Sequence, residues 1–256
     1  MTALLFLATP AVLSFRLPQE QARMLAEHVA LKQRFHYPHP QTIHQSPALA
    51  IQTVKSPPHS SKPAQWPFRV IWFGRSTGGS VYITIDDGWF PSNRVLALMH
   101  REHLPITAFL IRDAVAEHMA YWRSFLAAGG VIEDHTVSHP DLAQVSYSTA
   151  YYQWHDALLA YQDWFHGRPI VGRPPYGAID AQVIAAAKQA GLESLVMWSA
   201  VMSPKGLATW NGRPLAAGEI ILMHWDPGLY SELLQLLAVI RERHLAVAPL
   251  LSGIAP

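Results

Sequence analysis

The chain has 256 residues, 50% of them hydrophobic and 14% charged, which suits one good-sized domain with a buried core and excludes wholesale disorder. It contains no cysteine, so a disulfide scaffold, a cysteine nucleophile and thiolate metal sites are excluded. The formal net charge of +1 gives no electrostatic footprint for nucleic acid, and we expect no nucleic-acid partner. Histidine is unusually frequent, with 14 copies, which favours a metal site but also makes chance pairs more common.

The first quarter of the chain differs from the rest in charge and in proline content. Up to Pro67 it carries six Lys and Arg residues against Glu20 and Glu27, so it is about +4 and the remainder about −3. It also holds nine of the 20 prolines. We therefore predict an N-terminal extension over residues 1–67 and a main domain over residues 68–256.

Three segments make up this extension. Residues 3–13 form an apolar run that is too short to span a bilayer. The run is compatible with a secretory signal, although no basic residue precedes it and no clear cleavage site follows, or with an ordinary buried segment. Residues 17–35 can form a helix, and residues 36–67 have the composition of a linker. We expect no transmembrane helix, and the sequence leaves export open.

Beyond Pro67, apolar runs of strand length alternate with segments that can form helices. The alternation predicts right-handed crossovers and a parallel sheet. About seven such units are fewer than a complete eight-fold barrel has, so we predict an α/β fold, a distorted or incomplete (β/α) barrel, over an open doubly wound sheet. In chain order we expect strands at residues 81–86, 106–111, 131–133, 170–172, 194–198, 219–223 and 246–249, and helices at 92–103, 113–128, 147–165, 180–191 and 229–244, with caps at Ser92, Asp113, Ser146 and Asp180.

Two histidines follow the short strand predicted at residues 131–133. His135 and His139 are the only histidine pair four residues apart, and this spacing places both rings on one side of a helical turn, where they can bind one cation. With 14 histidines in 256 residues, about one such pair arises by chance. The pair by itself leaves two interpretations open, a metal site and two solvated loop histidines.

Two adjacent aspartates end the first predicted strand. Asp86 and Asp87 lie on opposite faces of a regular strand, and Gly88 relaxes the backbone so that both carboxylates can converge at its tip. The pair favours one acid for a metal and one for proton transfer; a solvated Asp-Gly turn is the alternative. Asp87 with the two histidines would supply two nitrogens and one oxygen, the composition of a catalytic zinc site with room for a water.

Two further residues follow predicted strands. Arg173 precedes two prolines that stiffen its loop, so its guanidinium can hold a carboxylate in a fixed orientation; an ordinary surface salt bridge is the alternative. His224 ends an apolar strand, and beside a metal site it would suit protonation of a leaving group. A lone histidine at a strand end is more often simply hydrogen-bonded, so neither residue decides the chemistry alone.

Four of these motifs occur together in a fixed order. Over residues 70–256 the chain resembles the polysaccharide deacetylases, also called NodB-homology or carbohydrate esterase family 4 proteins. The motifs that carry the resemblance are Thr-Ile-Asp-Asp-Gly at 84–88, His-Thr-Val-Ser-His-Pro at 135–140, Arg-Pro-Pro-Tyr-Gly at 173–177 and Leu-Met-His at 222–224.

The resemblance implies a distorted (β/α) barrel that removes acetyl groups from acetylated sugars. It implies a divalent metal, zinc first and cobalt or another ion as alternatives, bound by Asp87, His135 and His139. In the same way, Asp86 would be the general base, Arg173 would tether it, the Tyr176 backbone N–H would stabilise the oxyanion, and His224 would be the general acid.

One departure from the family pattern affects the acid. The family usually has an Asp-Trp element after the strand at residues 194–198, and this chain has Trp198-Ser199 followed by no acidic residue up to Gly206. The motifs therefore support the metal site more fully than they support the acid role of His224. Among the aromatic residues near the motifs, Trp89 and Trp225 are the candidates for stacking on sugar rings, because each lies within two residues of a proposed site residue.

The sequence thus predicts a metal-dependent hydrolase that removes acetyl groups from an acetylated carbohydrate, an N-acetylglucosamine polymer or acetylxylan, through a metal-activated water. We expect it in the cell envelope or secreted. One alternative is a hydrolase of the same fold that acts on a small non-sugar or cyclic amide. The other is a glycan-binding protein without turnover.

Overall fold

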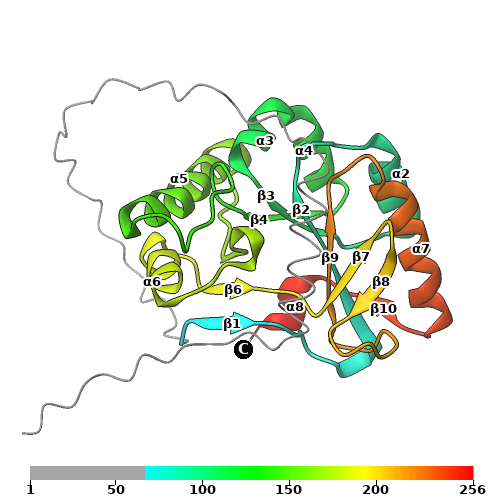
Figure 1. Ribbon diagram of the computed structural model, residues 1–256. Helices are drawn as coiled ribbons and strands as arrows, with labels where there is room; N and C mark the ends of the chain where they lie inside the picture. The colour runs from blue at the N-terminus through cyan, green and yellow to red at the C-terminus, as the bar shows by residue number, and fades with distance from the viewer. Residues whose placement is uncertain (1–66, 256) are drawn as a thin grey trace, which may run out of the picture.

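A computed structural model describes residues 67–255, in which strands and helices alternate (Figure 1). The predictions for residues 1–66 lie outside the described residues. No helix within residues 67–255 is long and apolar enough to cross a bilayer. The strands are β1 (Arg69–Ile71), β2 (Ser80–Asp87), β3 (Thr107–Leu110), β4 (Val131–Asp134), β5 (Val171–Gly172), β6 (Ser194–Val196), β7 (Ala200–Ser203), β8 (Gly206–Thr209), β9 (Ile220–His224) and β10 (Ala246–Val247). The helices are η1 (Thr77–Gly79), α2 (Asn93–Glu102), α3 (Arg112–Glu117), α4 (Met119–Ala127), α5 (Tyr147–Phe165), η2 (Pro175–Gly177), α6 (Ala181–Ala190), α7 (Leu229–Glu242) and α8 (Leu250–Ile254).

The strands form one sheet in the order β1-β6-β5-β4-β3-β2-β9-β7-β8, with β10 paired to β2. Every pairing is parallel except that of β7 with β8. In the described part of the chain, no strand pairing joins β1 to β8, so the sheet curls without closing. The predicted incomplete barrel is confirmed.

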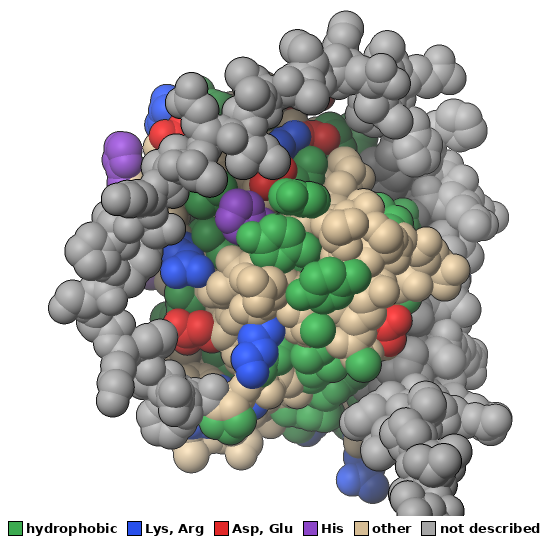
Figure 2. Space-filling model, turned by 90° about the vertical axis from the view of Figure 1, so that its left-hand side faces the viewer, with side chains coloured by type: hydrophobic (Ala, Val, Ile, Leu, Met, Phe, Trp, Pro, Cys, Tyr) green, Lys and Arg blue, Asp and Glu red, His purple; other side chains and the backbone are tan. Residues whose placement is uncertain are grey.

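Helices α2 to α7 lie around the outer side of the sheet, whereas α8 packs with Tyr82 and the other residues of its inner face (Figure 1). Helices α2 and α7 contact one another beside β2 and β9, and α5 packs against α6 at the opposite end. Figure 2 views this second side, where hydrophobic side chains reach the surface among polar and scattered charged ones. On α5, Tyr152 and Leu159 are exposed, whereas Trp154 is buried in the core between α5 and α6. Helix α5 is therefore a surface helix with one packed face.

Strand β2 shows how the residue pattern separates the two faces of the sheet. Val81, Ile83 and Ile85 pack outward in the core shared with α2 and α7. Tyr82 packs inward with residues of β3, β5, β6 and β9, and Thr84 hydrogen-bonds toward the same interior. Because side chains alternate along a strand, Asp86 also belongs to the inner face.

The predicted N-caps of two helices, Ser146 for α5 and Asp180 for α6, are confirmed. The Ser146 hydroxyl accepts from Thr149 N at 3.2 Å, and the Asp180 carboxylate accepts from Val183 N at 2.8 Å. Both side chains satisfy backbone N–H groups that have no partner inside the helix.

The helix predicted over residues 113–128 is wrong in its start and continuity. It is two helices, α3 and α4, joined at His118. Asp113 does not cap it, because α3 already begins at Arg112 and the Asp113 carboxylate accepts from the Arg112 guanidinium at 2.6 Å. Arg112 N and Asp113 N donate to the backbone oxygens of Thr136 and Val137 at 3.0 and 3.1 Å. Tertiary contacts thus supply what a capping side chain would otherwise supply.

The sequence analysis also missed several short elements, among them β1, β7, β8 and α8. The β7–β8 hairpin is antiparallel and turns at Pro204 and Lys205, and Gly206, the first residue of β8, has a φ of 98° that favours glycine. Strand β1 and helix α8 are three and five residues long, too short to leave a periodic pattern.

Candidate metal centre and active site

The site lies where neighbouring parallel strands end at one edge of the sheet. The register pairs Asp86 on β2 with His224 on β9, and Asp87 with Leu110 on β3. Leu110 in turn pairs with Asp134, the last residue of β4 before His135. The strand register thus places residues that are far apart in the sequence side by side at the same edge of the sheet.

The two aspartates converge because the backbone turns at Asp87 itself. Its φ is 80°, and that of Gly88 is 107°, so the turn begins one residue before the glycine to which the sequence assigned it. A left-handed φ is uncommon for a residue with a side chain, and such strain concentrates at functional sites. Thr136, His139 and Tyr176 share it, with φ of 73°, 63° and 60°.

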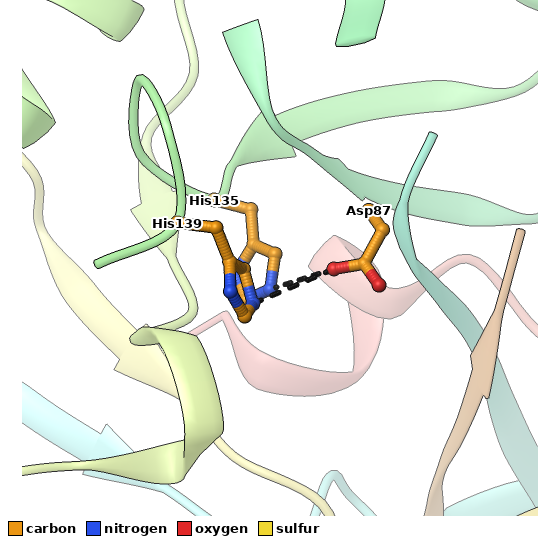
Figure 3. Close-up of side chains that lie close together, drawn as sticks. All are labelled: Asp87, His135 and His139. Atoms are coloured by element: carbon orange, nitrogen blue, oxygen red, sulfur yellow. Dashed lines mark ion pairs between the residues drawn. The ribbon is translucent and has the colours of Figure 1, made fainter. Parts of the chain in front are cut away.

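The side chains of Asp87, His135 and His139 point toward one another (Figure 3). Nε2 of each histidine lies 3.5 Å from Oδ1 of Asp87, and the three candidate ligand atoms all lie within 4.8 Å of one another. Two ligands bound about 2.1 Å from one ion at the tetrahedral angle are about 3.4 Å apart. The donor set and its spacing therefore fit a divalent ion.

The tautomer of His135 is set by Arg173. The backbone oxygen of Arg173 lies 2.6 Å from Nδ1 of His135, which must carry the proton because a carbonyl can only accept. Nε2 is then left with its lone pair facing Asp87. This arrangement, a ligand histidine oriented through its other nitrogen, is what metal centres require.

The turn that joins the two histidines is held by its own side chains. The carboxylate of Asp134 accepts from Thr136 N at 2.7 Å, and the hydroxyl of Thr136 accepts from His139 N at 3.0 Å. Burial raises the pKa of Asp134 well above its ordinary range. These two bonds contribute to the shape of the turn that leads from His135 to His139.

Arg173 is wholly buried and holds Asp86. Its Nη1 donates to Oδ1 of Asp86 at 2.7 Å and to the hydroxyl of Thr84 at 2.9 Å. Its other nitrogens donate to the backbone oxygens of Val196 and Met197 at 2.9 and 3.0 Å. Burial lowers the pKa of Arg173 and Asp86 opposes that effect, so the guanidinium stays charged.

The hold of Arg173 leaves the second oxygen of Asp86 facing the ligand cluster. Oδ2 lies 3.7 Å from Nε2 of His135. One oxygen of this carboxylate is thus anchored and the other is directed to the place where an ion would be bound. The sequence predicted this tether, and the structure brings the two residues together.

Tyr176 lies in the short helix η2, after the two prolines. Its ring meets that of His139 edge-on, with centroids 4.5 Å apart. Burial raises the pKa of Tyr176, and the Asp87 and Asp141 carboxylates add to the effect. The phenol therefore stays neutral and forms one wall of the site.

The family model for polysaccharide deacetylases matches residues 74–195, which include the proposed metal ligands, Asp86, Arg173 and Tyr176. A chitooligosaccharide deacetylase from Bradyrhizobium sp. is 31% identical over 166 residues, covering 58% of this chain and 73% of that protein. The chain belongs to the polysaccharide deacetylase family.

Other members of the polysaccharide deacetylase family differ in size and in activity. A bifunctional xylanase/xylan deacetylase from Cellvibrio japonicus is 29% identical over 163 residues, which are 59% of this chain and only 24% of that protein. The crystal structure of a family 4 carbohydrate esterase pseudoenzyme from Bacillus anthracis has a TM-score of 0.63 at 18% identity, covering 72% of this chain and 68% of that chain. The shared fold alone therefore does not decide whether a member is active.

In this member of the family, His224 ends β9 and is half-buried beside Asp86. Asp226 lies two residues after His224. Its carboxylate accepts a hydrogen bond from Gly228 N at 2.7 Å, within the loop that leads to α7. Burial raises the pKa of Asp226, with a smaller contribution from Asp87. Glu232, at the start of α7, is buried nearby, and burial together with Asp226 raises its pKa to about 7.

The prediction that Trp225 stacks on sugar is wrong. Trp225 has no exposed surface and packs edge-on against Trp122, with ring centroids 5.1 Å apart. As the residue after His224, it points to the opposite face, into the core of helices and sheet. Trp89 is half-buried and stays a candidate, beside Phe90, which is 40% exposed.

Sequence reasoning also missed Thr84 and Glu133. Thr84 lies two residues before Asp86 on the same face, so strand periodicity could have found it. Glu133 accepts from Ile170 N and Val171 N at 2.9 and 3.0 Å, and burial raises its pKa to about 8. Only the fold brings its partners, 37 and 38 residues away, to its carboxylate.

Proposed function

We propose that this polysaccharide deacetylase is a metal-dependent hydrolase that removes acetyl groups from an acetylated glycan. The observation that carries the proposal is the meeting of Asp87, His135 and His139, with their ligand atoms within 4.8 Å, beside an anchored Asp86. The family resemblance supports the reaction class, and the geometry supports a metal site.

Asp87, His135 and His139 would hold the ion. Two imidazole nitrogens and one carboxylate oxygen favour Zn²⁺ over the hard ions that prefer oxygen alone, with Co²⁺ as the alternative. When bound, such an ion polarises a carbonyl oxygen and lowers the pKa of a water molecule.

Asp86 is the proposed general base. Arg173 anchors its Oδ1 at 2.7 Å, so Oδ2, which faces His135, is the atom that receives the proton of the attacking water. A base held by a buried guanidinium keeps one orientation throughout the reaction, which reduces the reorganisation that the transition state requires.

His224 and the backbone N–H of Tyr176 are proposed to act on the acetyl group and its leaving atom. Strand register places His224 beside Asp86, close enough to serve the same bound group from the neighbouring strand. It would donate a proton to the departing amine or alkoxide, whereas the N–H of Tyr176 would stabilise the charge that develops on the carbonyl oxygen.

The substrate class is proposed from the relatives and from one half-buried aromatic residue, Trp89. Relatives are named as deacetylases of chitooligosaccharide, xylan and peptidoglycan N-acetylglucosamine. Trp89, two residues after Asp87, would stack on a sugar ring. We propose an N-acetylglucosamine polymer or acetylxylan as substrate, with the reaction outside the cytoplasm.

Acetate release tests the proposal. The purified chain is incubated with N-acetylated chitooligosaccharides and with acetylxylan, before and after treatment with a chelator, and after restoration with Zn²⁺ or Co²⁺. We expect acetate from one of the two glycans, lost with the chelator and regained with the ion.

Two results would contradict this function in different ways. Binding of a glycan with no acetate release under any metal condition would show a glycan-binding protein. Inactivity on glycans, together with chelator-sensitive hydrolysis of small cyclic amides, would show a different hydrolase.

A further inference from the structure

Helix α5 contacts the loop between the two ligand histidines through one side chain. Oε1 of Gln153 accepts from the backbone N–H groups of Val137 and Ser138, each at 3.0 Å. Nε2 of the same amide donates to the hydroxyl of Ser138 at 3.1 Å. Three hydrogen bonds thus join one half-buried residue of α5 to the middle of the loop.

The other hydrogen bonds hold the beginning of the loop and two of its backbone oxygens, but not the amides of Val137 and Ser138. His135 is fixed by its ring bond to Arg173 and by its backbone N–H, which donates to Leu110 at 3.0 Å. Helix α3 binds the backbone oxygens of Thr136 and Val137, which leaves the amides of this segment to other partners. Gln153 supplies those partners from a helix that contributes no ligand.

The position of His139 depends on this support. His139 lies at the far end of the loop, with a left-handed φ of 63° and its backbone N–H bonded to Thr136 of the same loop. Its ring must nevertheless meet the Asp87 oxygen at the distance that His135 keeps from it, 3.5 Å. A loop that is free to shift in the middle would move His139 and leave His135 in place.

We propose that Gln153 is a positioning residue for the metal centre, and that it sets metal affinity by fixing the loop between His135 and His139. The inference rests on the metal site of the proposed function. An amide suits the task because its single oxygen has two lone pairs for two adjacent N–H groups while its nitrogen donates to the Ser138 hydroxyl. Loss of a partner that orients a ligand typically weakens metal binding about 10–100-fold.

Zn²⁺ and Co²⁺ affinities of the full chain, measured by competition with a chromogenic chelator, test this role. We expect Gln153→Leu, which keeps the size and removes all three bonds, to bind both ions about 10–100-fold more weakly. Gln153→Glu should stay within about threefold of the wild type, because a carboxylate accepts from both N–H groups and the Ser138 hydroxyl can turn to donate. Gln162→Leu, at an exposed glutamine of the same helix, is the matched control and should bind as the wild type does.

The visible spectrum of the Co²⁺ form separates positioning from general stability. At saturating Co²⁺, Gln153→Leu should show shifted d–d bands, because one ligand has moved, whereas Gln153→Glu and Gln162→Leu should keep the wild-type bands. A change in folding stability alone would leave the spectrum of the folded, loaded protein unchanged. If Gln153→Leu does not fold, Gln153→Asn replaces it, because its side chain is one methylene shorter and its amide cannot reach the loop. We expect Gln153→Asn to bind Zn²⁺ and Co²⁺ more weakly than the wild type.

The inference and the proposed function fail in distinguishable ways. Wild-type affinity and spectrum in folded Gln153→Leu, or in Gln153→Asn where that variant replaces it, would overturn the role of Gln153 and leave the deacetylase proposal intact. A wild-type chain that binds neither ion would overturn both.

Discussion

The two sides of the active-site edge are built differently. On the ligand side, in the turn from Asp134 to His139, Asp134, Thr136 and His135 each make a hydrogen bond that shapes the turn or orients a ring. On the acid side, after His224, Glu232 is only 3% exposed and its Oε1 has no hydrogen-bond partner within residues 67–255. Gly228 leaves the room for that carboxyl group, since a Cβ there would lie 2.8 Å from Oε1.

The difference corresponds to what each side must do. A metal ligand must keep a lone pair in one direction, and hydrogen bonds to the rest of the fold provide that. A group that carries a proton needs an environment that disfavours its charged form, and burial provides that for Asp226 and Glu232, whose pKa values are raised. Burial occurs on both sides, and what distinguishes them is that the ligand histidines are oriented by hydrogen bonds, whereas Glu232 is buried with no partner for Oε1 within residues 67–255.

Removal of a ligand should have the largest effect. We expect Asp87→Asn to abolish metal binding and to lower acetate release by about 10⁴-fold or more, because several kcal/mol of transition-state stabilisation are lost with the ion. Metal content of the purified variant and acetate assays check this. His155→Ala, at a half-buried histidine of α5 outside the site, is the control. A variant that keeps its metal would remove Asp87 from the ligand set.

Removal of the proposed acid should leave metal binding unchanged. We expect His224→Ala to slow deacetylation by about 10²–10⁴-fold, the usual contribution of a positioned general acid, while metal affinity stays at the wild-type value. Parallel measurements of turnover and metal affinity distinguish the two sides. Undiminished turnover would exclude His224 from the mechanism.

Loss of Arg173 should affect the fold as well as the base. Arg173→Gln leaves the buried Asp86 carboxylate without its partner, so we expect the free energy of unfolding to fall by about 3–5 kcal/mol. Urea denaturation measures this. Arg168→Gln, at an exposed arginine that precedes β5, should change stability by less than about 1 kcal/mol. Equal effects of the two substitutions would contradict the tether.

Glu232→Gln should have the smallest effect, and it should depend on pH. Because the pKa of Glu232 is about 7 in the fold and ordinarily 4.5, the folded chain binds the extra proton between these values, and wild-type stability falls as pH rises through that window. Glu232→Gln cannot lose this proton, so its free energy of unfolding should rise relative to that of the wild type by about 1–3 kcal/mol from pH 4.5 to 7. Unfolding measured across this range checks it, with Glu242→Gln, at an exposed residue of the same helix, as the control. A pH-independent difference would show that Glu232 is not buried as described.

Much of the site could be predicted because strand ends are visible in the sequence. Apolar runs followed by Asp86, His135, Arg173 and His224 placed these residues at one edge of a parallel sheet, and the structure brings them together there. The prediction of Trp225 failed because nearness in sequence was taken for nearness in space. Adjacent strand residues face opposite sides, so Trp225 lies in the core.

By itself, the sequence determined the class of fold and the chemical kinds of group at the site, because hydrophobic alternation and donor atoms are local properties. The tertiary structure decided the turn at Asp87, the support of the histidine loop by Gln153 and the buried state of Glu232. Each of these depends on atoms from elements far apart in the chain. Only the pairing of the strands and the docking of helices α5 and α7 bring those atoms within hydrogen-bonding distance or bury them away from water.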